Sequence, residues 1–428
     1  MPGTPVERGP LTDGIAQYLF DKSAPIQTRP RIRDVIERPL TFPFISVDDH
    51  LCEPPDAFEG RLPGKYRDLT PRVFTGEDGC DYWQFGDRRV LIGAANVIAG
   101  WEVADWQYGP ITFADARPGT YDIDERVRDM DINGAIASLG FPSMVFGFAG
   151  QLFMRLPDQE FGLAAMRAYN DWVADGWWAP HPQRIIPCQV AWLLDPVIAA
   201  REIRRNAARG FRAVTFTEDP SKLGLPPISD EYWEPFLAAC SETETVINLH
   251  TGSSSQILPG GLSINGLVAA IDWLENAKVP LRFPDVKIVI AEGGIGWVPL
   301  LIDRLVYRRR YEHLPEAIDT WPSHGPSPEQ VLRENFWFTS FYDPSTLGAC
   351  HQIGVEHIMV ESDYPHQDSS WPDTQEFLAS QMGGLPPGDA ERIAWRNAAA
   401  LYRISATPES VFGSRYRRED PGLADTGS

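Results

Sequence analysis

A carboxylate and an imidazole stand two residues apart at the end of an apolar run, FPFISVDDH. Alternate side chains of an extended strand share a face, so Asp48 and His50 are expected to point one way and Asp49 the other. Together, Asp48 and His50 offer an oxygen and a nitrogen atom, which zinc, manganese and iron all accept as ligands. The spacing therefore predicts one half of a divalent-metal site.

Three later β-like runs also end in ionisable side chains. TVINLH ends in His250 and KIVIAE ends in Glu292. HIMVES leads directly into Asp363, and His366 follows three residues later. Burial of so many ionisable groups at one place costs free energy unless they are paired, and a bound cation would be a partner common to all of them. The strand ends together therefore form one candidate site.

Each of these residues also has a purely structural interpretation. Glu292 can pair with Arg304 or Arg308 of the following helical pattern. His366 can be an ordinary hydrogen-bonded loop histidine, and Cys52 a small buried apolar residue. The structural interpretation is less economical for the whole set, because it requires an independent explanation at every strand end.

The elements that must position these groups follow a β/α pattern. Short, nearly continuous apolar runs alternate with longer helical patterns, which is typical of parallel strands covered on both faces. The expected strands are 44–48, 135–140, 185–192, 213–217, 245–250, 287–292, 335–340 and 357–362. Eight such runs predict an α/β fold, a (β/α)8 TIM barrel, with an open doubly wound sheet as the alternative. Active sites of such barrels lie at the carboxyl ends of the strands, where the ionisable residues stand.

Three segments depart from the regular pattern. Residues 1–42 mix prolines, charges and isolated apolar residues and are expected to form an N-terminal arm, while 407–428 are expected to form a polar C-terminal tail. The barrel is expected over 43–406. The stretch between the first two strands is far longer than a usual βα connection, so 54–119 is predicted to be an insertion over the carboxyl ends of the strands.

The composition excludes several classes of protein. Of the 428 residues, 43% are hydrophobic and 23% are charged, which is ordinary for a globular protein and excludes wholesale disorder. The net charge of −21 argues against a nucleic-acid partner, whose phosphates require a basic surface. The sequence offers no apolar run near the ~20 residues that span a bilayer. The five cysteines are dispersed and form no CxxC pair. We therefore expect a cytoplasmic protein without a membrane partner.

The chain resembles the amidohydrolase superfamily, specifically the amidohydrolase-2 branch, which includes aminocarboxymuconate-semialdehyde decarboxylase and γ-resorcylate decarboxylase. The motifs that carry the resemblance span most of the expected barrel. They are VDDHLCEP (47–54), INLHTG (247–252), FPDVKIVIAEGGIGWVP (283–299), IMVESDYPH (358–366) and RNAAALY (396–402).

The resemblance implies a barrel with one divalent metal ion and no separate organic cofactor. Asp48 and His50 occupy the first-strand ligand positions of the family. His250 occupies the next position and Asp363 the last, and Asp363 is also the implied proton-transfer residue. The implied ion is zinc, with manganese and iron as alternatives, and Cys52 could serve as a ligand if the first motif were aligned one step later.

The family often carries another histidine after the sixth strand, where this chain has Glu292. Glu292 is therefore a candidate second acid or base, and His366 a candidate to orient the substrate or Asp363. The implied activity is non-oxidative decarboxylation of a small carboxylic acid, aromatic acids included. The alternatives are metal-dependent hydrolysis of a C–C or C–N bond of a carbonyl-bearing substrate, and a non-catalytic binding protein on a decayed barrel. A homodimer is expected.

Overall fold

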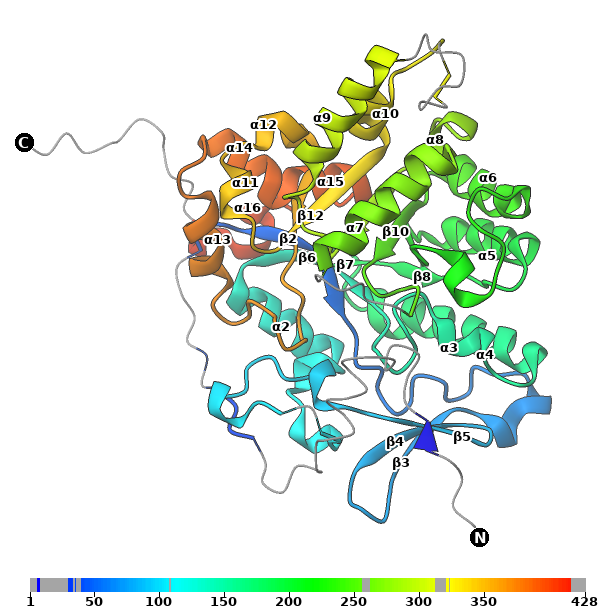
Figure 1. Cartoon of the computed structure of the whole chain (residues 1–428). Coiled ribbons are helices and arrows are strands. Elements are labelled where there is room, and N and C mark those ends of the chain that lie inside the picture. The colour runs from blue at the N-terminus through cyan, green and yellow to red at the C-terminus, as the bar shows by residue number, and fades with distance from the viewer. Residues whose placement is uncertain are drawn as a thin grey trace, which may run out of the picture.

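The computed structural model describes residues 6–7, 30–33, 35, 40–107, 109–255, 262–311, 321–322 and 324–416 (Figure 1). A parallel sheet forms the centre of this part of the chain, and each strand pairs in parallel with its neighbours in the order β7-β6-β2-β13-β12-β11-β10-β9-β8. The strands are β2 (Phe44–His50), β6 (Ala135–Phe141), β7 (Ile185–Ile186), β8 (Cys188–Val190), β9 (Ala213–Phe216), β10 (Val246–His250), β11 (Ile288–Ala291), β12 (Phe336–Ser340) and β13 (Ile358–Val360).

The sheet closes on itself through Pro187. This residue alone separates β7, which pairs with β6, from β8, which pairs with β9. Proline has no backbone N–H to donate to a ladder, but the Pro187 carbonyl still accepts from Ala213 N at 3.4 Å. Taken as one strand, β7 and β8 reduce the nine segments among the described residues to the eight strands of a closed (β/α)8 barrel.

All eight expected strands are present, and no end differs from the expected one by more than two residues. The expectation of a (β/α)8 barrel is therefore confirmed, and the open doubly wound sheet is wrong. Almost every strand residue is buried, because side chains fill the barrel interior on one face and pack against helices on the other.

Helices surround the sheet (Figure 1). The helices between successive strands, or after the last one, are α2 (Ile123–Asn133), α3 (Gln151–Met154), α4 (Gln159–Trp172), α5 (Pro196–Arg209), α6 (Glu234–Thr243), α7 (Leu262–Ile271), α8 (Val279–Arg282), α9 (Val298–Arg308), α10 (Pro328–Asn335), α11 (Pro344–Leu347), α12 (Cys350–Ile353), α13 (Thr374–Met382), α14 (Pro387–Glu391), α15 (Asn397–Tyr402) and α16 (Pro408–Phe412). Helix α2 has well-defined ends, since the Asp122 side chain accepts from Glu125 N and Gly134 ends the helix at φ 82°.

The segment 54–119 holds a small separate sheet. Its antiparallel strands are β3 (Arg72–Thr75), β4 (Asp81–Phe85) and β5 (Arg88–Leu91), and β1 (Val6–Glu7) pairs with β5 in parallel. The loops that follow β6 and β13 both bond to this segment, since Met144 N donates to Asn96 Oδ1 at 2.9 Å and Ala99 N donates to Pro365 O at 3.0 Å. These loops lie at the carboxyl ends of the barrel strands, so the segment is bonded to that end of the barrel.

The two ends of the chain are described only in part. Most of 1–42, the expected arm, lies outside the described residues, but Arg31 pairs with Asp105 of the insertion at 2.9 Å. The expected tail, 407–428, begins with α16, in which Pro408 and Phe412 are buried. Residues 417–428 lie outside the described part. None of the described helices combines the length and the apolar composition that a bilayer crossing requires.

Candidate metal centre

The four residues with implied metal-binding roles meet at the carboxyl ends of the barrel strands. His50 Nε2, at the end of β2, lies 3.4 Å from Asp48 Oδ1 and 3.1 Å from His250 Nε2 at the end of β10. His250 Nε2 lies 3.4 Å from the same Asp48 oxygen. Asp363, which follows β13, brings its Oδ1 to 3.1 Å from His50 Nε2. The donor atoms of Asp48, His50 and His250 therefore form one group, and Asp363 joins this group through His50.

The geometry of these donors fits a cation. All four residues are at least 97% buried, and the carboxylate oxygens of Asp48 and Asp363 contact histidine ring nitrogens. His250 Nδ1 lies 2.6 Å from the Thr251 carbonyl, which can only accept, so Nδ1 carries a proton and, in the neutral ring, Nε2 presents a lone pair to the centre. Two carboxylates and two imidazoles form a donor set that suits Zn²⁺, Mn²⁺ or Fe²⁺.

The three residues with implied acid, base or orienting roles lie in the same cluster. His366 Nδ1 is 3.2 Å from Asp363 Oδ1, and the His366 ring stacks on His50 with centroids 3.6 Å apart. Glu292 Oε2 is 3.6 Å from His250 Nδ1. Both Glu292 and Asp363 have left-handed backbones, with φ of 54° and 52°. Non-glycine residues rarely adopt this conformation, and it recurs where backbone strain serves a site.

Burial and mutual repulsion disfavour charge on these carboxyl groups. Burial raises the pKa of Asp363 well above its ordinary value, and the neighbouring Asp368 and Glu292 raise it further. Burial likewise raises the pKa of Glu292 well above its ordinary value. Because several like charges cannot all ionise at one buried place, the cluster needs protons or a cation to compensate them.

The structural alternative for Glu292 is not found. The ion pair of Glu292 is with His250, whereas Arg308 contacts Glu275. Cys52 is 4% exposed and packs in the apolar core, and burial raises the pKa of its thiol. Among the described residues no candidate metal cluster includes Cys52, so the first motif is read from Asp48.

Two buried glutamates at strand ends were missed. Glu361, at the end of β13, is 2% exposed, and its Oε2 accepts from Glu292 N at 3.2 Å. Its spacing of two residues from Asp363 repeats that of Asp48 and His50, and this signal could have found it. Glu218 follows β9 in the run AVTFTE, so the strand-end rule that gave His250 could have found Glu218 as well.

Asp49 points away from the cluster, as the alternation predicted. It is 2% exposed and accepts from Ser46 Oγ at 2.8 Å, from Ser362 Oγ at 2.7 Å, from Tyr364 N at 3.1 Å and from Ser138 Oγ. Its carboxylate therefore joins β2 and β6 to the segment that carries Asp363.

We expect Asp49→Ala to reduce the free energy of unfolding by about 3–5 kcal/mol, because several buried donors lose their acceptor at once. Denaturant unfolding of the metal-free protein measures this change. Ser138→Ala removes one donor only and should cost about 1 kcal/mol. An unchanged unfolding midpoint for Asp49→Ala would show that the carboxylate contributes nothing to stability.

A buried arginine connects the insertion to the strand that carries the first two ligands. Arg126 of α2 is 1% exposed, and its Nε donates to Gly119 O at 2.6 Å. Its guanidinium also donates to His50 O at 2.7 Å and lies 4.5 Å from the centre of the Tyr364 ring. The guanidinium thus fixes the backbone directly behind His50.

The sequence of this chain is similar to a known protein family. A sequence model of the amidohydrolase family matches residues 115–404. The chain belongs to the amidohydrolase family. The family match agrees with the barrel and covers His250, Glu292 and Asp363, whereas Asp48 and His50 precede the matched region.

Individual relatives of this amidohydrolase are distant. A decarboxylase of Emericella nidulans, orsB, is 26% identical over 256 residues, which are 53% of this chain and 72% of that protein. The structure of an amidohydrolase from Mycobacterium avium subsp. paratuberculosis K-10 superposes with a TM-score of 0.65 at 22% identity, covering 85% of this chain and 98% of that one.

A dihydroxybenzoic acid decarboxylase from Polaromonas sp. JS666, solved with bound manganese and the inhibitor 2-nitroresorcinol, superposes with a TM-score of 0.53 at 20% identity. That superposition covers 68% of this chain and 89% of the other. At these identities the solved structures support the fold.

Proposed function

We propose that this amidohydrolase is a metal-dependent decarboxylase of a small aromatic carboxylic acid. The observation that carries the proposal is the cluster of buried donor atoms at the strand ends, in which Asp48, His50 and His250 form one group and Asp363 contacts His50. These four residues would hold one divalent ion. The relatives named as decarboxylases support the choice of reaction.

The ion, when bound, supplies a Lewis acid that polarises and orients the oxygen atoms of the substrate. The chain supplies the proton. As the bond between the ring and the carboxylate breaks, its electron pair stays on the ring carbon, which takes a proton from the Asp363 carboxyl, and CO2 leaves. Asp363 is buried and lies beside His50 and His366, where its carboxyl group can exchange that proton.

Two neighbours support Asp363 in this role. His366, 3.2 Å from Asp363 Oδ1, orients its carboxyl group. Glu292 provides a second buried carboxyl that can hold or return a proton. The rings of Phe148 and His250 lie 4.0 Å apart between centroids, and such an apolar wall excludes water from the cluster.

The donor set leaves zinc, manganese and iron as candidate ions, with zinc as our first choice. The manganese bound in the Polaromonas decarboxylase makes manganese the main alternative. Elemental analysis of protein purified without a metal-affinity tag decides between them. A decayed, non-catalytic barrel would hold no stoichiometric metal and would not recover any when zinc or manganese is added.

Product analysis tests the reaction itself. Incubation with hydroxybenzoic acids in D2O is expected to release CO2 and to place one deuterium on the ring carbon that carried the carboxylate. The competing proposal is hydrolysis of a C–C or C–N bond, which Glu292 in place of the family histidine favours. Hydrolysis would instead carry ¹⁸O from labelled water into the product, and that outcome would replace the decarboxylase assignment.

A further inference from the structure

A buried carboxyl group outside the metal cluster holds the loop that follows His250. Glu218, after β9, is 4% exposed. Its Oε2 accepts from Gly252 N at 3.0 Å and from Ser254 Oγ at 3.1 Å. In return, Glu218 N donates to Ser253 Oγ at 3.0 Å. Three consecutive residues of one loop are therefore bonded to a single residue that follows the neighbouring strand β9.

A buried tryptophan fixes the backbone of Glu218. Glu218 O accepts from Trp273 Nε1 at 2.9 Å, and the Trp273 side chain is fully buried. Thr251 begins this loop, and its carbonyl oxygen accepts a hydrogen bond from His250 Nδ1. The orientation of the His250 ring therefore depends on the same short loop that Glu218 fixes.

We propose that Glu218 is a positioning residue of the metal centre, because its carboxylate fixes the loop that leads on from His250. The inference rests on the proposed role of His250 as a metal ligand. Partners behind a ligand commonly set its orientation, and their loss weakens metal affinity by about 10–100-fold. Glu218 acts through the backbone and touches none of the proposed ligands.

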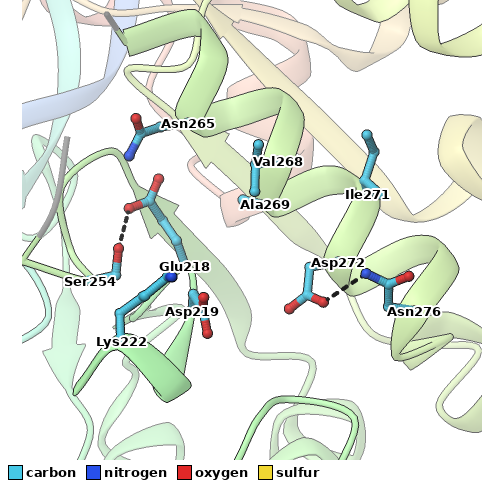
Figure 2. Close-up of a pocket in the computed structure, with 10 residues that line it drawn as sticks. All are labelled: Glu218, Asp219, Lys222, Ser254, Asn265, Val268, Ala269, Ile271, Asp272 and Asn276. Atoms are coloured by element: carbon cyan, nitrogen blue, oxygen red, sulfur yellow. Dashed lines mark hydrogen bonds between the residues drawn. The ribbon is translucent and has the colours of Figure 1, made fainter. Parts of the chain in front are cut away.

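Glu218 also lines a cavity of about 220 Å³ outside the barrel wall, between the loop after β9 and α7. Figure 2 shows its carboxyl group directed between Ser254 and Asn265, with Lys222 and Asp219 on the same side of the cavity. The cavity gives protons a route to Glu218 that does not pass through the metal cluster. Asp272 lines the opposite side of the cavity.

Burial raises the pKa of Glu218 to about 7, against the opposing effects of its hydrogen bonds and of His250. The carboxyl is therefore mostly protonated at pH 6 and mostly ionised at pH 8. An ionised carboxylate accepts from Gly252 N–H and Ser254 O–H more strongly than a neutral acid does. The other charged groups that face it are Glu292 across the strand ends and the three ionisable side chains of the cavity.

The test is the affinity of the metal-depleted full-length chain for Mn²⁺, measured by calorimetry at pH 6, 7 and 8. Glu218→Gln is expected to bind Mn²⁺ about 10-fold more weakly than the unchanged protein at pH 8 and nearly equally at pH 6. Ser254→Ala should shift the affinity in the same direction by less. Glu202→Gln, a substitution at an equally buried glutamate that pairs with Arg167 and Arg205 on the outer helix α5, should change nothing.

A purely structural role for Glu218 would give an affinity loss that does not vary with pH, and that result would overturn the inference. Equal affinities of Glu218→Gln and the unchanged protein at all three pH values would overturn it as well. Failure of the unchanged protein to bind Mn²⁺ or Zn²⁺ would instead contradict the proposed function. The two failures are therefore distinguishable without a turnover assay.

Discussion

His250→Ala is expected to lose bound metal and turnover together. Its Nε2 lies 3.1 Å from His50 Nε2 and 3.4 Å from Asp48 Oδ1, while its Nδ1 bonds the Thr251 carbonyl. Alanine at position 250 leaves Asp48 and His50 of β2 without the imidazole nitrogen that β10 contributes to their group. We expect less than about a tenth of an equivalent of metal and a fall in kcat/KM of more than about 10³-fold. Elemental analysis and steady-state kinetics measure the two effects.

His351→Ala is the matched control for this experiment. His351 is exposed and pairs with Asp389 at 3.0 Å, so its removal should alter neither metal content nor rate. Retention of both metal and turnover in His250→Ala would show that the proposed ligand set is wrong.

Asp363→Asn is expected to separate metal binding from proton transfer. Asparagine keeps one oxygen that can act as a ligand, so most of the metal should remain, with affinity reduced about 10-fold. The amide cannot carry the proton that the carboxyl delivers to the ring carbon, so kcat should fall about 10²–10⁴-fold. Metal content, kcat and KM must be measured on the same preparation.

Two comparisons sharpen the Asp363 experiment. Asp195→Asn changes the residue that caps α5, where asparagine caps equally well, and should be neutral. Glu292→Gln should reduce kcat by less than Asp363→Asn, because Glu292 Oε2 lies 3.6 Å from His250 Nδ1, the ring nitrogen that bonds the Thr251 carbonyl. A full rate with Asp363→Asn would remove Asp363 from the proton-transfer step.

The barrel could be predicted because its strands are buried on both faces and so stand out as continuous apolar runs. β10 and β11 are examples, since VINLH and IVIA are buried throughout. The interruption at Pro187 was not anticipated, although a proline inside a strand pattern signals such a break. The burial of Arg126 could not be predicted, because one of its partners is the carbonyl of His50, 76 residues away in the chain.

The convergence of the site was predictable from a single rule, that parallel strands of a barrel present their carboxyl ends at one rim. This rule found His250, Glu292 and Asp363 without knowledge of any contact. It was not applied to Glu218, whose effect on the site depends on hydrogen bonds to a loop. Hydrogen bonds between side chain and backbone across two strands leave no periodic trace in a sequence.

The two hydrogen bonds of Arg126, to the carbonyls of Gly119 and His50, limit how this protein can be re-engineered. Replacement of 54–119 by a shorter crossover would remove the Gly119 carbonyl that accepts from the guanidinium. The buried charge of Arg126 would then lose one of its two carbonyl partners. Shuffled variants should therefore keep the junction at Gly119 intact and move the cut upstream of it. The segment 54–119 and the barrel would then have to be transferred together as one unit.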